Sequence, residues 1–392
     1  MTTTHSPNGI AAAADRASAL GPAMASAGSA APPRRASASP DELSLSVIMP
    51  TISWTGCFEA CAQQVIRLIE ESPSGAAEFL VVFDGSGTAP PAWLSATGVR
   101  VVFTGSRRGP ATARNLAASS AVGRVLLFVD ADCELAPDAI GRVEATFAAA
   151  PDLVGMFGAY DDAPACSGFV SQFRNLLHHH THITHPGRAG TFWAGCGAIR
   201  RSAFDDIGGF DEGFRHPSIE DIELGMRVRA NGGRIHLDPD LRCKHHKSWT
   251  LLSMIKTDVL HRAVPWTQLI LKQGEIPTTL NLDWSNRISG AAAVLALVVG
   301  ALGIAVGGTP MRAAFILALM LQGALAWMHR DFYWLCFRRG GAIFGLTAFA
   351  LHWLFYVYSS LTFGTVVALS KAKTFAVGGK SYPRPNWLRG SR

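Results

Sequence analysis

The chain has 392 residues, of which 48% are hydrophobic, and a formal net charge of +6 at pH 7. This hydrophobic content is too high for an ordinary soluble protein, and the excess lies in the last third of the chain, which indicates a membrane-attached enzyme or carrier. The positive charge suits anionic lipid or phosphorylated ligands, but no basic patch interleaved with stacking aromatic residues favours nucleic acid, which we exclude as a partner.

Seven cysteines, an odd number without a C-x-x-C pair, are typical of reduced thiols in a cytosol-facing domain. Residues 1–42 are rich in Ala, Ser, Pro and Gly and hold no apolar stretch long enough for a signal peptide. We therefore expect a disordered tail there.

Apolar runs and helical periodicity alternate from residue 43 onward. They predict strands at 43–50, 78–84, 99–103 and 125–129, and helices at 57–71 and 110–118. Pro110 suits the first position of the second helix. Strand and helix follow one another with short connections, which predicts an α/β fold with a Rossmann-like, mostly parallel sheet, followed by an α-helical membrane region.

The run VLLFVDADCE, residues 125–134, is an apolar strand that ends at two carboxylates, Asp130 and Asp132. In an open α/β sheet this end of a strand is where ligands bind. Two carboxylates so close repel each other unless a cation lies between them, and Mg²⁺ or Mn²⁺ prefers such oxygen ligands and can hold a diphosphate. A solvated turn is the alternative interpretation of a bare D-x-D.

Four motifs follow one another between residues 43 and 250: SVIMPT, EFLVVFDGS, GPATARNLAASSAVGRVLLFVDADCEL and GFDEGFRHPSIEDIELGMRVRANGG. Their order resembles that of the family-2 glycosyltransferases with a GT-A fold. The resemblance implies an inverting transferase that uses a nucleotide-diphosphate sugar and a divalent metal, Mg²⁺ or Mn²⁺. It implies these donor and metal residues: Pro50, Thr51, Asp84 and Gly85 at the nucleoside, Arg114 and Asn115 bracing the nucleotide, and Asp130 and Asp132 at the metal and diphosphate.

The chain departs from the family pattern in three places. Ile52-Ser53 stand where the family commonly has Tyr-Asn, and Phe83-Asp84 stand where it often has paired aspartates, which bears on the choice of nucleotide. The Q-x-x-R-W signature of processive synthases is absent, so we expect one sugar to be transferred per encounter.

Five histidines follow a predicted helix at 167–177: His178, His179, His180, His182 and His185. No carboxylate or cysteine completes a tetrahedral set nearby, so we prefer a polar loop at the acceptor cleft over a zinc site. The next segment, residues 190–201, reads as a strand in which Gly195 and Gly197 permit close approach of a ligand. The resemblance assigns Trp193 and Gly195 of this segment to the acceptor side.

Glu220 and Asp221 open a predicted helix whose Leu224 and Val228 face inward. Acidic residues in a first turn also complement the helix dipole, so N-terminal capping is the alternative to a catalytic role. An inverting transfer needs a carboxylate that takes the proton of the acceptor hydroxyl. Within the pattern E-D-x-E-L-x-x-R, the resemblance assigns this base to Asp221, while Glu220 orients the loop or the acceptor.

Two further strands are expected at 234–237 and 241–245. Alternation places Leu241, Cys243 and His245 on the inward face of the second strand. The resemblance therefore implies a contact of His245 with the metal or the diphosphate, and a surface histidine pair with His246 is the alternative.

From 248 to 272, apolar and aromatic residues alternate with Lys256, Arg262 and Lys272, which predicts amphipathic helices in a membrane interface. Pro265 should kink or break the helix. We expect Lys256, His261 and Arg262 to meet either the phosphate of a polyprenyl lipid or bulk anionic headgroups, and we place Arg262 on the acceptor side.

Residues 288–308 carry no charge and are long enough to span a bilayer, and 313–328 should return as the second arm of a hairpin. After an interfacial stretch at 332–337, the uncharged segment 340–370 gives a third span. We expect a multi-pass protein of the cell membrane with a cytoplasmic catalytic domain. An odd number of spans exports the basic tail, against the positive-inside rule, unless the last segment re-enters without crossing.

The sequence thus predicts a tail (1–42), a transferase domain (43–247), interfacial helices (248–286), a membrane region (287–370) and a basic tail (371–392). The leading hypothesis is a membrane-bound inverting glycosyltransferase that acts on a hydroxyl acceptor, either lipid-linked or a glycan. One alternative is transfer to a polyprenyl phosphate, whose anionic oxygen hardly needs a base. The other is a catalytically silent membrane scaffold.

Overall fold

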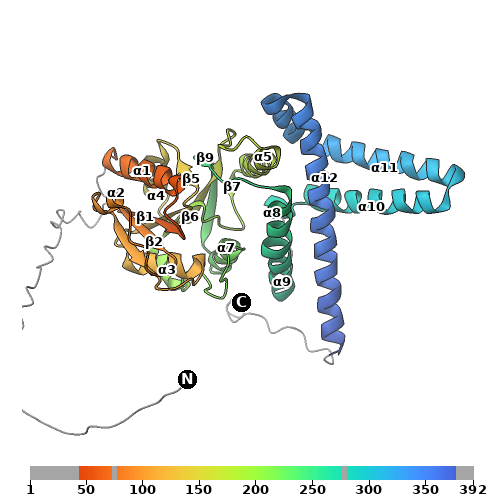
Figure 1. Ribbon diagram of the computed structural model, residues 1–392. Helices are drawn as coiled ribbons and strands as arrows, with labels where there is room; N and C mark the ends of the chain where they lie inside the picture. The colour runs from red at the N-terminus through yellow and green to blue at the C-terminus, as the bar shows by residue number, and fades with distance from the viewer. Residues whose placement is uncertain (1–43, 73–76, 275–279, 377–392) are drawn as a thin grey trace, which may run out of the picture. The chain divides into compact units, whose positions relative to one another are not determined.

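The computed structural model describes residues 44–72, 77–274 and 280–376, all within one compact unit (Figure 1). The tail expected at 1–42 and residues 377–392 of the basic tail lie outside the described residues. Within them, a domain built around a β-sheet is followed by helices that carry most of the apolar excess of the sequence.

The sheet has nine strands in the order β3-β2-β1-β4-β8-β6-β9-β5, with β7 paired to β9. Their bounds are β1 Leu45–Thr51, β2 Ala77–Phe83, β3 Arg100–Phe103, β4 Val125–Val129, β5 Cys133–Leu135, β6 Leu153–Tyr160, β7 Gly187–Arg188, β8 Cys196–Arg200 and β9 Arg234–His245. The half formed by β3, β2, β1 and β4 is entirely parallel, and its four strands confirm the predicted ones. Beyond β4 the sheet is mixed, because β8 runs antiparallel to both β4 and β6.

Seven helices flank this sheet in the chain up to residue 230: α1 Gly56–Glu70, α2 Ala92–Ser95, α3 Pro110–Ser120, α4 Ala139–Ala149, α5 Phe169–Ile183, α6 Arg201–Asp206 and α7 Glu220–Ala230. The helices predicted at 57–71 and 110–118 are confirmed, and Pro110 is the first residue of α3. The segment from β5 to β6, which includes α4, was not predicted.

Side-chain alternation along the buried strands builds one hydrophobic core on each face of the sheet. Val125, Leu127 and Val129 of β4 belong to the core covered by α1 and α4. Leu126 and Phe128 belong to the opposite core, which α3, α6 and α7 cover. Because successive strand residues point to opposite faces, the residue after Val129 turns toward α3 and α7.

Two strand predictions are corrected in this domain. The strand expected at 190–201 begins only at Cys196, so Trp193 and Gly195 lie in the loop before β8. The strands expected at 234–237 and 241–245 are one strand, β9, whose pairing with β6 is interrupted by an irregularity near residues 238–241. The inward placement of Leu241, Cys243 and His245 is confirmed, since all three are buried.

The histidines expected in a loop lie instead on the last turns of α5 and in the turn that follows, because α5 continues to Ile183. His179 and His182 are buried against the edge of β6, where their Nδ1 atoms bond to the carbonyl oxygens of Tyr160 and Gly158, respectively. These contacts with the sheet extend α5 over the histidine-rich segment, whose polar residues predicted a loop.

The interfacial segment begins with α8 Leu251–Lys256, continues as a π-helix at Thr257–Ala263 and ends with α9 Val264–Gln273. Of the two predicted effects of Pro265, a kink or a break, the break does not occur, because the helix continues through this residue. The wider π-helical turns lie directly before Pro265 and change the hydrogen-bond register there, which accommodates a residue without an N–H group.

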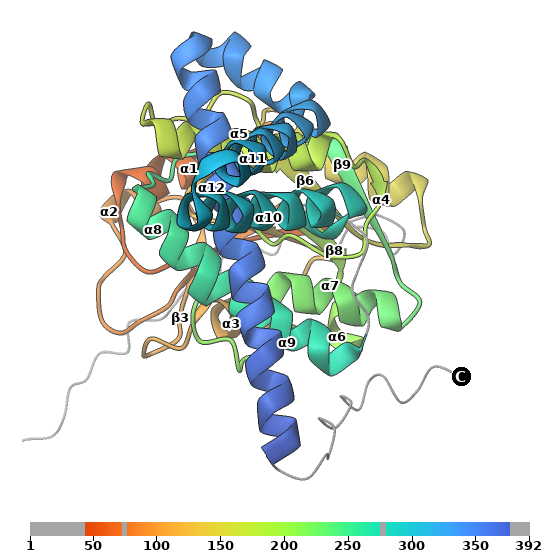
Figure 2. The ribbon, with the colours of Figure 1, turned by 90° about the vertical axis from the view of Figure 1, so that its right-hand side faces the viewer.

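The chain ends in three helices, α10 Trp284–Val306, α11 Gly308–Met328 and α12 Arg330–Ala376, and all three are long and apolar enough to cross a membrane. The expected interfacial stretch at 332–337 forms the first turns of α12, before Gly341 interrupts the helix with a φ of 75°. α12 packs against α5: Phe332, Phe344 and Leu351 share a hydrophobic cluster with Phe173 and Leu176. Figure 2 shows α10 crossing in front of α12.

Candidate active site

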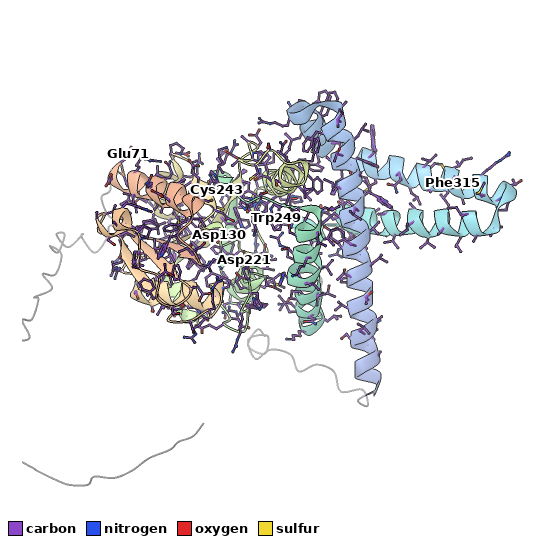
Figure 3. The ribbon with its side chains drawn as sticks, in the orientation of Figure 1. Glu71, Asp130, Asp221, Cys243, Trp249 and Phe315 are labelled. Carbon is purple, nitrogen blue, oxygen red and sulfur yellow. The ribbon has the colours of Figure 1, made fainter. Side chains whose placement is uncertain are left out.

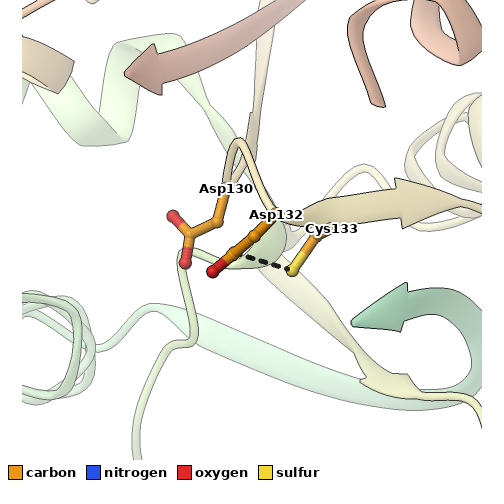
Figure 4. Close-up of side chains that lie close together, drawn as sticks. All are labelled: Asp130, Asp132 and Cys133. Carbon is orange, nitrogen blue, oxygen red and sulfur yellow. Dashed lines mark hydrogen bonds between the residues drawn. The ribbon is translucent and has the colours of Figure 1, made fainter. Parts of the chain in front are cut away.

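Asp130 and Asp132 follow β4 directly, at the carboxyl end of the parallel half of the sheet (Figure 4). Their carboxylate oxygens and the Cys133 sulfur lie within 4.8 Å of one another. Asp130 turns toward α3 and α7, as the alternation of β4 requires, whereas Cys133 returns to the core as the first residue of β5. The structure thus brings the two predicted metal ligands together at the end of one strand.

The donor set fits a hard divalent cation. Burial raises the pKa of Cys133 to about 12, so its thiol stays protonated and does not compete as a thiolate ligand. Burial opposes the ionisation of Asp132, but the neighbouring His245 outweighs it and lowers the pKa of Asp132. Two carboxylates then offer oxygen ligands and leave the remaining positions of an Mg²⁺ or Mn²⁺ ion to phosphate and water.

His245, the predicted third metal residue, lies close to Asp132 but not inside this cluster. Its Nε2 is 3.7 Å from Asp132 Oδ2, and its ring stacks on Tyr160 with the ring centres 4.3 Å apart. Its role as a metal or diphosphate contact remains a prediction, and its position beside Asp132 is compatible with that role.

Arg114 of α3 joins the metal motif to the start of α7. Its guanidinium is buried and donates to Asp130 Oδ1 at 2.7 Å and to Glu220 Oε1 at 3.0 Å. Burial alone would lower its pKa, but the neighbouring carboxylates outweigh burial and raise it, so Arg114 is a permanent cation. A single buried charge therefore holds two of the predicted site residues from different elements in one place.

Asp221 follows Glu220 in the first turn of α7. Its carboxylate accepts hydrogen bonds from the backbone N–H groups of Ala194, at 3.2 Å, and Ile222, at 2.8 Å. Burial and the adjacent Glu220 raise the pKa of Asp221 to about 7, although Arg114 opposes the shift. A carboxylate that titrates near neutral pH is suited to accepting a proton during turnover. Capping of the α7 N-terminus does not explain why the Ala194 N–H, in the loop before β8, donates a hydrogen bond to Asp221.

The loop before β8 connects the two acidic motifs. Gly195 accepts a hydrogen bond from the backbone of Asp130 at 3.1 Å, and its neighbour Ala194 donates to Asp221. Figure 3 shows Asp130 and Asp221 close together in the domain. A Cβ atom at Gly195 would lie 2.6 Å from the ring of Trp193, so only glycine allows this ring to fold over the loop.

The residues that are predicted to contact the nucleoside mainly form hydrogen bonds with backbone groups of the protein in this structure. Asp84 is buried and accepts from the N–H groups of Arg108 and Gly109 at 2.8 and 2.9 Å, and Gly85 N–H donates to Thr104. Thr51 is buried and bonds to Ser53, and Pro50 is the residue before it in β1. Donor binding by these residues stays a prediction.

Asn115 likewise pairs with the backbone of Phe210 in both directions, at 2.8 and 2.9 Å. It therefore holds the GFDE loop that leads toward α7. This contact gives Asn115 a defined structural role beside its predicted one at the nucleotide.

Among the described residues, the histidines of α5 form no group of three potential metal ligands. His178 packs instead against the rings of Tyr160 and Trp193, with centre distances of 4.1 and 4.6 Å. Burial lowers the pKa values of His178 and His182, the latter to about 4, so both rings are neutral at physiological pH. Tyr160 was missed by sequence reasoning, because it ends a strand that carried no motif.

Residues 46–208 match the family model described as "Glycosyl transferase family 2". Human polypeptide N-acetylgalactosaminyltransferase 6 is 30% identical over 165 residues, which cover 36% of this chain and 26% of that protein. The uncharacterized protein y4gI of Sinorhizobium fredii is 28% identical over 227 residues, 52% of this chain and 24% of that protein. The chain thus spans about a quarter of the length of these curated relatives.

Among solved structures, a mannosyltransferase from Pyrobaculum calidifontis in complex with GDP-Man and Mn²⁺ is similar to this chain. Its sequence identity is 15% and its TM-score 0.44, and the match covers 83% of this chain and 86% of that one.

The cluster at the end of β4 predicts a metal-binding phenotype. We expect Asp132→Asn to weaken Mn²⁺ binding by about tenfold or more, because the change removes one of two anionic ligands. Titration of the full-length protein in detergent, with free Mn²⁺ followed by electron paramagnetic resonance, measures this. Asp152→Asn, which alters an exposed carboxylate paired with Arg234, is the matched control. Equal Mn²⁺ affinity in both variants would refute the site.

Proposed function

We propose that this chain, whose residues 46–208 form a family-2 glycosyltransferase domain, is a membrane-bound, metal-dependent inverting glycosyltransferase. It transfers one sugar from a nucleotide-diphosphate donor to a hydroxyl group of a lipid-linked acceptor. The observation that carries the proposal is the arrangement around Arg114, in which a metal-binding carboxylate and an acidic helix start share one buried cation.

In the proposed reaction, the acceptor oxygen attacks the anomeric carbon of the donor sugar while the bond from that carbon to the diphosphate breaks. Asp130 and Asp132 would hold a divalent ion, which would supply positive charge to stabilise the departing nucleoside diphosphate. Asp221 takes the acceptor proton, and its pKa of about 7 makes it a better base than an ordinary aspartate. Attack from the face opposite the leaving group inverts the anomeric configuration.

The contacts of the neighbouring residues support the following roles in the proposed reaction. Arg114 and Glu220 keep the start of α7 against the metal motif, and the Ala194 N–H orients the carboxylate of Asp221. In this proposal His245 contacts the metal or the diphosphate, and Trp193 and Gly195 lie on the acceptor side. Pro50, Thr51, Asp84, Gly85 and Asn115 border the nucleotide.

We further propose that α10 and α11 cross the membrane as a hairpin, while α12 lies at the cytoplasmic interface. α12 contacts α5 through Phe344 and Leu351, and Tyr358 of α12 donates to Asp258 of the π-helix at 2.6 Å. These partners cannot enter the hydrocarbon core, because α5 carries Arg174 and the histidines. This arrangement keeps Lys371 on the side of the catalytic domain, as the positive-inside rule requires.

The first test is transfer itself. Full-length protein in detergent, offered a panel of nucleotide-diphosphate sugars with Mn²⁺ or with a chelator, should bind or hydrolyse at least one donor only when the metal is present. Binding is measured by calorimetry and hydrolysis by release of the nucleoside diphosphate. Failure of every donor with Mn²⁺ would favour the membrane scaffold.

The raised pKa of Asp221 predicts a pH profile. Below about pH 7 the carboxyl is protonated and cannot accept a proton, so kcat should rise between about pH 6 and pH 8 and then level off. We expect Asp221→Asn to lower kcat by about 100-fold to 10,000-fold and to abolish this rise. Asp206→Asn, which changes an exposed carboxyl group, should retain both the wild-type kcat and its rise with pH. Full turnover in Asp221→Asn would indicate an acceptor that is already anionic, as in transfer to a polyprenyl phosphate.

The proposed topology predicts the accessibility of two positions. In sealed right-side-out vesicles prepared from cells that produce variants lacking the native cysteines, Lys371→Cys should resist a membrane-impermeant maleimide and Arg312→Cys should react. Lysis of the vesicles should make both reactive. Both residues are exposed on the surface of the protein. Labelling of Lys371→Cys in intact vesicles would show that α12 crosses.

A further inference from the structure

A cavity of about 470 Å³ lies between the catalytic domain and the apolar helices. Its walls come from α5, the π-helix, α9, α10 and α12. Most of the lining is apolar, with Leu177, Ile270, Phe355 and Phe363 among its residues. Such a chamber suits a ligand that is itself largely apolar.

The charged residues of the lining are three arginines and one aspartate: Arg174, Arg262, Arg287 and Asp258. Asp258 is buried and binds Arg174 at 2.6 Å and Tyr358 at 2.6 Å. Arg262 approaches the same carboxylate only to 3.8 Å, beyond hydrogen-bond distance. The cavity lining therefore carries more positive than negative charge. The N–H groups of the Arg262 guanidinium are available to donate hydrogen bonds to a ligand.

Two further polar atoms on the cavity wall have no hydrogen-bond partner among the residues that the structure describes. Nδ1 of His178 and Nε1 of Trp266 are both buried and make no hydrogen bond. The indole nitrogen of tryptophan can only donate, so Trp266 requires an acceptor from outside. Free donors and a surplus of guanidinium groups match the oxygen atoms of a phosphate.

The cavity continues into an apolar groove between α10 and α12. The groove has a volume of about 660 Å³, and it shares Ala291 and Ser360 with the cavity. On α10 it is lined by Gly290, Val294 and Val298, which are spaced four residues apart and so form a single face of the helix. The two helices touch closely there, since a Cβ atom at Gly290 would lie 2.4 Å from Ser360 Oγ. A single groove admits a single hydrocarbon chain.

His178 connects the cavity to the catalytic centre. Its ring lines the cavity and packs on Tyr160, which in turn stacks on His245 beside Asp132. It also packs on Trp193, next to Ala194, the residue that holds Asp221. A stack of three rings, His178, Tyr160 and His245, therefore connects the cavity to Asp132 of the metal motif.

We infer that the cavity and the groove bind a single-chain membrane lipid with a phosphate-bearing headgroup, and that this lipid carries the acceptor. The headgroup lies at Arg174 and Arg262, with Trp266 as a further donor, and the hydrocarbon chain follows the groove between α10 and α12. Asp258 is a positioning residue that orients Arg174. This inference rests on the proposed function for the acceptor role, but the lipid site itself does not depend on transfer.

Binding of farnesyl phosphate to delipidated full-length protein in detergent, measured by calorimetry, tests the site. Farnesol tests the need for the phosphate, inorganic phosphate the need for the chain, and dioleoylphosphatidylglycerol the selectivity for one chain. We expect farnesyl phosphate to bind at least about tenfold more tightly than each of the others. Arg262→Gln should lower its affinity by about tenfold. Lys272→Gln, which removes a positive charge from an exposed position of α9 outside the cavity, should not.

The groove is tested with a second pair of variants. Ala291→Phe should fill the groove and lower the affinity for farnesyl phosphate, whereas Ala301→Phe, on α10 outside the groove, should leave it unchanged. Equal effects of Arg262→Gln and Lys272→Gln, or equal binding of the phosphate, the alcohol and the two-chain lipid, would overturn the inference.

Donor binding in the same preparations separates the two proposals. Selective binding of farnesyl phosphate without binding of any nucleotide sugar would leave the lipid site standing and refute the transferase. Metal-dependent donor binding without the selectivity for farnesyl phosphate would do the reverse.

Discussion

The architecture of the candidate site depends on the buried guanidinium of Arg114. A buried charge is tolerated only when it is paired, and here Asp130 and Glu220 supply the pairing from opposite ends of the chain's central region. Removal of this cation would leave Asp130, Glu220 and Asp221 as three neighbouring carboxylates without compensation. The same cation limits how far burial and Glu220 raise the pKa of Asp221, so one contact fixes both the geometry and the acidity of the site.

Local patterns were sufficient for the parallel half of the sheet and for the metal motif. The apolar run 125–129 fixes a strand buried on both faces, and the alternation of its side chains fixes the direction in which Asp130 points. The contact between Ala194 and Asp221 was beyond reach, because it joins a loop to a helix start across 27 positions of the chain. The contacts of Tyr160 and Arg174 could likewise not be predicted, since their partners come from distant segments of the chain.

The two helix predictions that the structure corrects share a physical cause. Histidines and Pro265 have weak or unfavourable helix propensity, and local reasoning therefore ended or broke a helix at each. In the structure, bonds from His179 and His182 to β6 stabilise the end of α5, and a π-helical segment absorbs Pro265. Tertiary contacts outweigh propensities that amount to about 1 kcal/mol or less for a histidine. Asp84 shows a related limit: its position was predicted, but not that the loop at Arg108 and Gly109 would take up its hydrogen bonds.

The π-helical segment also places charge at the boundary between domain and membrane helices. Asp258 lies within it, and its carboxylate is met by Arg174 from α5 and by Tyr358 from α12. Asp258 and Arg262 are four positions apart and line the same cavity. Three elements that are far apart in sequence therefore converge on one buried anion. Since the rings of His178, Tyr160 and His245 stack in succession from the cavity to Asp132, a change in the cavity has a continuous packed route to the metal motif.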